Sequence, residues 1–113
     1  MNITIDALQK YLANRYCGWT SEQDMFMKLV EELGEVAEVL NKRAGRKATA
    51  EANLQMQLGT ELADMLHYIV AIAAINGIDL TQVIIEKDRK ASVKYNHTVN
   101  LETFLSDSAL KKN

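Results

Sequence analysis

Apolar residues along the chain recur at spacings of three and four positions rather than two, which predicts helices instead of strands. The sequence contains no proline and only five glycines, so little in it interrupts long helices. The predicted helices run from Asp6 to Tyr16, from Glu22 to Arg43, from Thr49–Glu51 to Asn76, from Leu80 to about Tyr95, and for a short stretch after Asn100. We therefore expect an all-α fold in which four main helices pack as a bundle.

Polar residues and glycines mark the expected ends of these helices. Ser21 and Asp79 are expected N-caps, because their side-chain oxygens can accept hydrogen bonds from the N–H groups of the first turn. Gly45 and Gly77 are expected to end helices, since glycine adopts the left-handed conformation without steric cost. Gly59 lies inside the third predicted helix, and we expect it to kink or interrupt that helix.

Length and composition fit one globular domain. The chain has 113 residues, of which 48% are hydrophobic and 25% are charged, as in ordinary globular proteins. We expect a domain over residues 1–96, with its core in 20–95, and a tail over 97–113. The net charge of −2 provides no broad basic surface, so we expect neither duplex nucleic acid nor an anionic membrane as a partner.

Cysteine content and the apolar segments favour a cytoplasmic location. Cys17 is the only cysteine, so it has no partner for an internal disulfide or a CxxC motif. The first ten residues contain no apolar run typical of a secretory signal. The stretch from Leu62 to Ile75 is shorter than the roughly 20 apolar residues needed to span a bilayer, and it contains Asp64 and His67.

The third predicted helix is apolar on nearly every side between Leu62 and Ile75. A single layer of neighbouring helices covers only part of such a helix. A second copy of the chain would cover the rest, so we expect a homodimer or a homotetramer.

Two groups of carboxylates fall on consecutive predicted helices, namely Glu31, Glu32 and Glu35 on the second helix and Glu61 and Asp64 on the third. At about 100° per residue, each group spans a sector no wider than about 100°. A solvated face with ion pairs explains the first group by itself. The second group opens an apolar stretch, where an unpaired carboxylate costs several kcal/mol.

A divalent cation satisfies such carboxylates directly. Lys28 and Lys87 are too few to neutralise five carboxylates. Ligands that are all oxygen favour Mg²⁺ or Mn²⁺, and Mg²⁺ commonly completes its coordination with water and substrate phosphates. The sequence has no GxxxxGK[ST] motif, which excludes a P-loop enzyme. Hydrolysis of a phosphoanhydride by metal-activated water is the reaction class that fits.

The segment Lys28-Leu29-Val30-Glu31-Glu32-Leu33-Gly34-Glu35, followed after 25 residues by Glu61-Leu62-Ala63-Asp64, resembles the ExxE…ExxD signature of the MazG-like, all-α nucleoside triphosphate pyrophosphohydrolases. The stretch from Asn76 to Leu80, leading to Glu86-Lys87, resembles that family's turn into its last core helix. The resemblance covers roughly residues 20–95. It implies a four-helix fold assembled as a dimer or tetramer, and Mg²⁺-dependent cleavage of (d)NTPs to the monophosphate and pyrophosphate.

The resemblance also implies roles for individual residues. The implied metal ligands are Glu32, Glu35, Glu61 and Asp64. Glu31 matches an extra leading glutamate and would bind the metal or orient the attacking water, with Glu35 also part of the catalytic group. Lys28 and Lys87 would contact phosphate oxygens, and Lys87, Lys90 and Asn96 loosely follow the family's closing Lys/Asn/Arg pattern, so Asn96 is a substrate-binding candidate.

Other residues leave alternatives open. Trp19 could stack on a nucleobase or plug the turn before the second helix, and Tyr68 shares the helix face of Glu61 and Asp64. Asp64 and His67 have the i,i+3 spacing of the carboxylate–histidine pairs in ferritin-like bundles, so a di-iron or di-manganese protein is the alternative function. A packed or hydrogen-bonded histidine is the other interpretation of His67. A third hypothesis is a helical interaction module with an acidic face.

Overall fold

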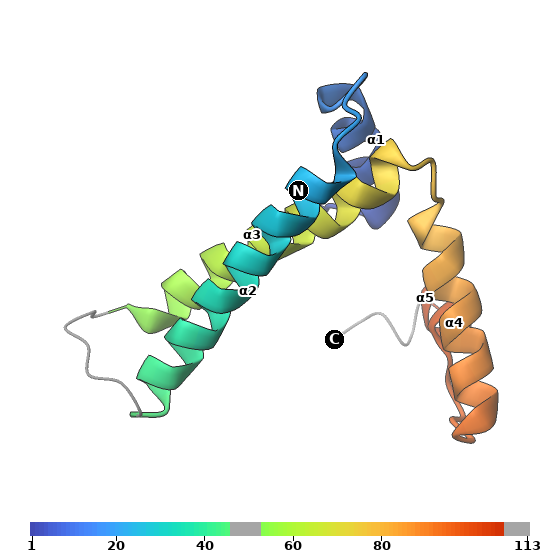
Figure 1. The fold of residues 1–113 in the computed structure, drawn as a ribbon. Helices are drawn as coiled ribbons and strands as arrows, with labels where there is room; N and C mark the ends of the chain where they lie inside the picture. The colour runs from blue at the N-terminus through green and yellow to red at the C-terminus, as the bar shows by residue number, and fades with distance from the viewer. Residues whose placement is uncertain (46–52, 108–113) are drawn as a thin grey trace. The chain divides into compact units, whose positions relative to one another are not determined.

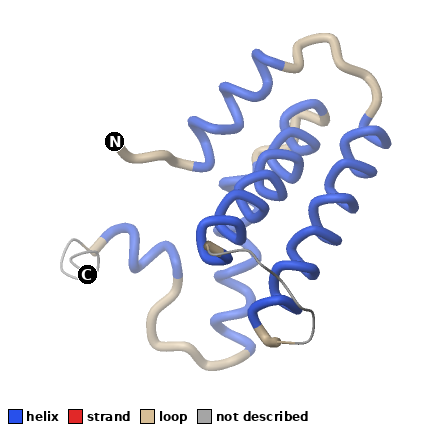
Figure 2. The backbone as a smooth tube through the Cα atoms, turned by 90° about the vertical axis from the view of Figure 1, so that its left-hand side faces the viewer, coloured by secondary structure: helices blue, strands red, loops and turns tan. Residues whose placement is uncertain are grey.

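The computed structural model describes residues 1–45 and 53–107, and every regular element within these ranges is an α-helix (Figure 1). The elements are α1 (Ile5–Arg15), α2 (Glu22–Arg43), α3 (Leu54–Ile75), α4 (Leu80–Lys94) and α5 (Leu101–Ser106). Figure 2 shows the same helices joined by loops, without a strand in the described ranges. The predicted all-α fold class is confirmed, and α2 has the predicted bounds.

Each helix begins with a polar N-cap whose side chain accepts a hydrogen bond from a first-turn N–H group. These caps are Thr4, Ser21, Asn53, Asp79 and Asn100. Such a bond satisfies one of the four N–H groups that a helix start leaves unpaired, and replacing the cap by alanine typically costs about 1 kcal/mol. The predicted caps Ser21 and Asp79 are confirmed.

Two predictions concern the third helix: its start and the effect of Gly59. Its expected start at Thr49–Glu51 lies outside the described residues, and the described helix begins at Leu54, after Asn53 accepts from the Met56 N–H at 2.9 Å. The expected interruption at Gly59 is wrong, because α3 continues through this position without a break, whereas a kink there stays a prediction. Glycine inside a helix costs about 1 kcal/mol relative to alanine.

The two glycines expected to end helices do so. Gly45 follows α2 with φ +75°, and Gly77 follows α3 with φ +65°. Both values lie in the left-handed region, where a Cβ atom would be strained. The chain therefore leaves both long helices where the sequence predicts.

The helices fall into two compact units, Met1–Ile78 and Asp79–Asn113. In the first unit α2 and α3 lie side by side in opposite directions, and α1 packs against α3 (Figure 1). Its most deeply buried side chains come from all three helices: Leu12 of α1, Val39 of α2, and Val70 and Ala71 of α3. Burying one Val or Leu fully contributes about 1.5–3 kcal/mol.

α3 is 22 residues long and contains an 18-residue window with a mean hydropathy of 1.4, so by length and composition it is long and apolar enough to cross a membrane. The shorter stretch from Leu62 to Ile75 considered in the sequence does not reach that length. One such helix is a weak indication, because the core helix of a soluble protein passes the same test. α3 packs against α1 and α2, and it carries Glu61 and Asp64 near its middle.

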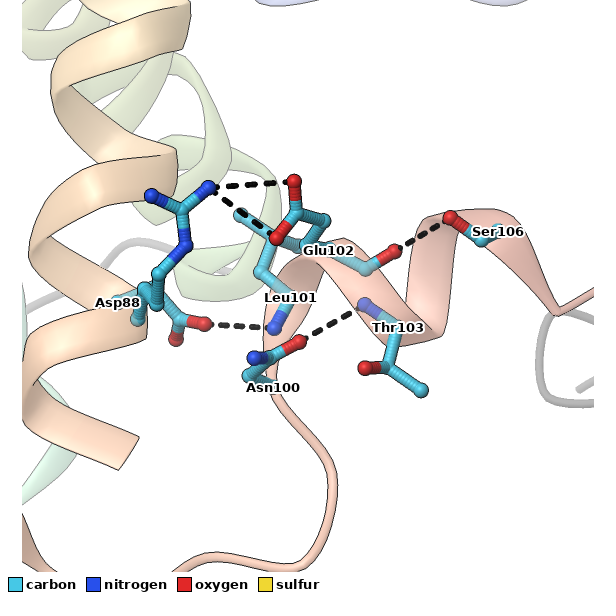
Figure 3. Close-up of polar contacts among 7 residues, drawn as sticks. Asp88, Asn100, Leu101, Glu102, Thr103 and Ser106 are labelled. Carbon is cyan, nitrogen blue, oxygen red and sulfur yellow. Dashed lines mark hydrogen bonds and ion pairs between the residues drawn. The ribbon is translucent and has the colours of Figure 1, made fainter. Parts of the chain in front are cut away.

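In the second unit, polar contacts join α5 to α4 (Figure 3). The Asp88 carboxylate accepts a hydrogen bond from the Leu101 N–H at 2.6 Å. Arg89 Nη2 donates to both carboxylate oxygens of Glu102, at 3.1 and 3.2 Å. The short helix expected after Asn100 is therefore present, and its first turn is fixed by α4.

Candidate active site

Three carboxylates meet where α2 and α3 face each other. Glu32 of α2 and Glu61 and Asp64 of α3 each offer one oxygen, and these oxygens lie within 4.8 Å of one another. Glu61 and Asp64 share a face because residues three apart are neighbours on a helix. The packing of α2 against α3 then brings Glu32 to the same point. We call these three residues the carboxylate cluster.

Glu35, one turn after Glu31 on α2, lies beside the cluster and changes its electrostatics. The adjacent carboxyl groups of Glu35 and then Glu32, together with partial burial, raise the pKa of Glu61 from 4.5 to about 7. The main cause is hydrogen bonding, because protonated Glu61 can share its proton with the carboxylates of Glu35 and Glu32; burial and charge repulsion disfavour the ionised form further. Metal-free Glu61 therefore holds a proton over a pH range in which ordinary glutamates are ionised.

The cluster has the donor set of a divalent cation site. Oε2 of Glu32 and Oε2 of Glu61 are buried and have no hydrogen-bond partner among the described residues. Within the same residues, no lysine or arginine forms an ion pair with the cluster, and Lys28 pairs with Glu31 instead. Oxygen-only ligands suit Mg²⁺ and Mn²⁺, and a cation would compensate the charge that the fold leaves unpaired. The residues present thus fit the predicted metal.

A pocket of about 410 Å³ lies within the first unit. It is lined by Tyr16, Trp19, Asp24, Met25, Met27, Lys28, Glu31 and Tyr68. Aromatic and methionine side chains provide most of this lining, and Lys28, Glu31 and Asp24 add charged groups. Such a mixture of apolar walls and a few polar groups is typical of small-molecule sites.

The pocket and the carboxylate cluster are neighbours along the same two helices. Lys28 precedes Glu32 by four residues on α2, and Tyr68 follows Asp64 by four residues on α3. Because the two helices run in opposite directions (Figure 1), Lys28 and Tyr68 are both displaced toward the same end of the helix pair. Each lies about 5.4 Å, one helical turn, from its partner in the cluster. A ligand could therefore place one end in the pocket and the other at the cluster.

The structure brings most of the predicted site residues together. Glu32, Glu61 and Asp64 form the cluster, and Glu35 contacts Glu61. Glu31 points to the pocket, where its carboxylate is 3.5 Å from Lys28 Nζ. Trp19 lines the same pocket.

Two predicted substrate-binding residues belong to the other unit. Lys87 is an exposed residue of α4, and Asn96 follows α4 with φ +58°. The cluster and the pocket consist of residues of the first unit alone. The roles of Lys87 and Asn96 remain predictions.

His67 is hydrogen-bonded rather than part of a metal-binding group. Its Nε2 lies 2.7 Å from the Tyr16 hydroxyl oxygen. Among the described residues, the group suited to a metal ion contains carboxylates and no histidine. This is the hydrogen-bonded histidine considered in the sequence, and it gives no support to a ferritin-like di-iron site, which needs a histidine ligand.

Sequence reasoning missed Tyr16, Asp24, Met25 and Met27 as lining residues of the pocket. A local signal for Tyr16 exists, since it precedes Trp19 by three residues at the end of α1. Its contact with His67 joins residues 51 positions apart, which no local periodicity reveals.

Fold and site together define an all-α protein whose carboxylate cluster lies between two antiparallel helices. Residues 20–99 match the family model of the MazG nucleotide pyrophosphohydrolase domain, and the chain belongs to this family. The matched residues include the whole cluster, whereas Tyr16 and Trp19 lie just before them. None of the curated proteins matches the chain.

Proposed function

We propose that this nucleotide pyrophosphohydrolase requires Mg²⁺ and hydrolyses nucleoside and deoxynucleoside triphosphates to the monophosphate and pyrophosphate. Family membership supports the general activity. The observation that carries the metal requirement is the cluster of Glu32, Glu61 and Asp64, whose ligand oxygens lie within 4.8 Å of one another. Mn²⁺, which prefers the same oxygen ligands, is the expected substitute.

In the proposed reaction, the phosphoanhydride bond between the α- and β-phosphates breaks and water supplies the oxygen and hydrogen that complete the two products. Glu32, Glu61 and Asp64 would hold the metal. When bound, Mg²⁺ would neutralise phosphate charge and lower the pKa of a coordinated water. Glu35, which contacts Glu61, and Glu31, at the edge of the pocket, are the carboxylates available to accept the proton of the attacking water.

The adjacent pocket would hold the nucleoside. Trp19 offers an aromatic face, and stacking on such a face accepts any base. Lys28 pairs with Glu31 at 3.5 Å, and its side chain is 59% exposed, so this ion pair is weak and Lys28 remains available to a phosphate oxygen. Lys87 and Asn96 of the second unit are further proposed phosphate contacts.

A hydrolysis screen tests this function. The eight common NTPs and dNTPs are incubated with Mg²⁺ or with EDTA, and the products are separated by chromatography. We expect monophosphate and pyrophosphate with Mg²⁺ only. We expect Glu35→Gln and Asp64→Asn to lower kcat at least about 100-fold, because each removes a charge that the metal or the attacking water needs.

Asp6→Asn is the matched control for Asp64→Asn. Asp6 forms an exposed i,i+4 pair with Lys10 on α1 and lies outside the cluster, so this variant should keep wild-type activity. Diphosphate and phosphate as products would contradict the proposed cleavage position. Full activity in both Glu35→Gln and Asp64→Asn would contradict the proposed site.

A further inference from the structure

Four ring side chains form a continuous chain of edge-to-face contacts in the first unit. The ring centroids of Trp19 and Tyr16 are 5.8 Å apart, those of Tyr16 and His67 are 5.8 Å apart, and those of His67 and Tyr68 are 5.0 Å apart. The interplanar angles of these pairs are 74°, 77° and 78°. Edge-to-face pairs of this kind are favourable beyond the apolar area that they bury.

Hydrogen bonds fix both ends of the Tyr16–Trp19 pair. The Trp19 indole N–H donates to the Ser21 carbonyl oxygen at 2.8 Å. The Tyr16 hydroxyl and His67 Nε2 are 2.7 Å apart. A neutral imidazole carries a proton on one nitrogen only, so Nε2 accepts the hydroxyl proton in one tautomer and donates to the hydroxyl oxygen in the other. The bond holds Tyr16 in either case.

His67 differs from the other three rings in its position. Trp19, Tyr16 and Tyr68 line the pocket, whereas His67 is not among the lining residues and contacts both tyrosines. Tyr16 lies at the C-cap of α1 and Tyr68 lies on α3, so no bond along one helix sets their spacing. The imidazole lies between them and contacts both rings.

Two aromatic residues of the pocket lie outside the segment that matches the family model. Tyr16 and Trp19 precede residues 20–99, and only Tyr68 and His67 lie within them. The aromatic wall of the pocket therefore combines a segment outside the domain match with α3. The hydrogen bond between the Tyr16 hydroxyl and His67 Nε2 connects these two parts.

We infer that His67 is a positioning residue for nucleobase binding, which holds Tyr16 and Tyr68 so that the pocket receives a flat aromatic base one helical turn from the carboxylate cluster. This inference rests on the proposed function, because it takes the pocket ligand to be the base of the substrate. Stacking on aromatic rings is tolerant of base identity. We therefore expect the pocket to discriminate strongly between a nucleotide and a sugar phosphate that lacks a base. We expect it to discriminate only weakly between different bases.

Trp19 provides a direct test, since it is the only tryptophan in the chain and it lines the pocket. Its fluorescence is followed while AMP, dCMP or the base-free probe ribose 5-phosphate is added without metal. We expect a saturable change with the two nucleoside monophosphates and none with ribose 5-phosphate. We expect His67→Ala and Tyr16→Phe to bind the monophosphates about threefold to tenfold more weakly, the cost of one lost hydrogen bond.

Two further variants separate positioning from a general loss of structure. His67→Gln can still hydrogen-bond the Tyr16 hydroxyl, so it should bind more tightly than His67→Ala. Tyr11→Phe removes a hydroxyl from an exposed tyrosine of the same helix α1 and should bind like wild type. In hydrolysis, His67→Ala should raise KM with little change in kcat, and its Mg²⁺ affinity by calorimetry should equal that of wild type.

Several outcomes overturn the inference. Equal monophosphate binding by wild type, His67→Ala and Tyr16→Phe would exclude positioning by His67 while leaving hydrolysis untouched. A Trp19 response to ribose 5-phosphate equal to that with AMP would exclude base binding in this pocket. Loss of Mg²⁺ binding in His67→Ala would make His67 a metal ligand. Absence of hydrolysis alongside the expected fluorescence differences would remove the proposed function and keep the positioning role of His67, so the two failures are distinguishable.

Discussion

At the scale of single residues, Glu61 shows how the fold prepares a cation site. Three acidic neighbours surround it, and the fold supplies no basic side chain to the cluster among the described residues. Without metal, a proton on Glu61 allows it to hydrogen-bond the carboxylates of Glu35 and Glu32, which is the main reason that its pKa rises to about 7. With metal, the proton is replaced by a divalent charge.

This environment predicts how stability depends on pH. The pKa of Glu61 is raised from 4.5 to about 7 in the folded protein, so between these values the folded state keeps a proton that the unfolded chain has lost. Rising pH then favours unfolding. The stability linked to protonated Glu61 is complete below pH 4.5 and is lost as the pH rises through about 7. In EDTA, we expect the Tm of wild type to fall relative to that of Glu61→Gln between pH 5 and pH 8.

Asp6→Asn is the control for this measurement, and its Tm should follow wild type at every pH. Mg²⁺ should reverse the loss at pH 8 in wild type, by about 2.7 kcal/mol at a concentration 100 times its Kd, and should have a much smaller effect in Glu61→Gln. A difference in Tm between wild type and Glu61→Gln that does not change with pH would show that Glu61 titrates normally in the folded protein.

The sequence predicts the carboxylates far better than the pocket. Glu32, Glu61 and Asp64 follow from helical spacing on two consecutive helices, because a helix fixes which residues share a face. Tyr16 and His67 meet only because α1 packs on α3, and the sequence contains no local sign of that contact. Local periodicity thus determines the cluster, whereas tertiary packing determines the pocket.

At the scale of helices, single residues determine where the elements begin and end. Ser21, Asp79 and Gly77 act as predicted, because capping depends only on local hydrogen bonding and on the sign of φ. Asn53 was missed as a cap, since Thr49 and Glu51 nearby also have residue types typical of a helix start. Several candidates within one turn leave a helix start ambiguous in a sequence.

Gly59 gives a stability prediction for α3. It lies inside the helix without the left-handed φ that requires glycine, and a Cβ atom there would meet nothing within 4 Å beyond the adjoining backbone of its own helix. Gly59→Ala should therefore stabilise the protein by about 0.5–1 kcal/mol, because alanine loses less backbone entropy. For a unit of this size we expect Tm to rise by about 2–8 °C in thermal unfolding followed by circular dichroism.

Gly77→Ala is the opposite control. Gly77 has φ +65°, where an L side chain is strained, so the same substitution should destabilise the protein by about 1–2 kcal/mol. A lower Tm for Gly59→Ala would mean that another surface packs against this position of α3 in solution. The pair of variants separates the intrinsic helix preference from the backbone conformation.

At the scale of the whole molecule, two apolar stripes remain exposed on the first unit. They repeat at helical spacing on adjacent helices and consist of Phe26, Val30 and Leu33 on α2 and Leu62, Leu66 and Ile69 on α3. Each of these side chains is between 41% and 55% exposed. Contiguous apolar surface on a soluble protein commonly marks an interface, and the expectation that one layer of helices leaves α3 partly uncovered agrees with these exposures.

We therefore expect a homodimer or homotetramer in which a second copy covers these stripes. Leu33→Glu and Leu66→Glu should shift the sedimentation coefficient toward the monomer, because each places a charge where the partner would bury it. Ile3→Glu is the matched control, since Ile3 is 78% exposed and lies outside both stripes, and it should sediment like wild type.

If a second copy covers these stripes, we expect assembly and activity to be coupled. Leu33 follows Glu32 directly in the sequence, and Leu62 follows Glu61, so an interface over the stripes would adjoin the carboxylate cluster. A partner there would exclude water from one side of the cluster and strengthen its hold on a cation, because charges interact more strongly at low dielectric. We expect the specific activity of Leu66→Glu to fall together with its dimer fraction, and to recover as protein concentration drives reassociation. A wild-type protein that sediments as a monomer at every concentration, yet is fully active, would show that one chain forms the complete site.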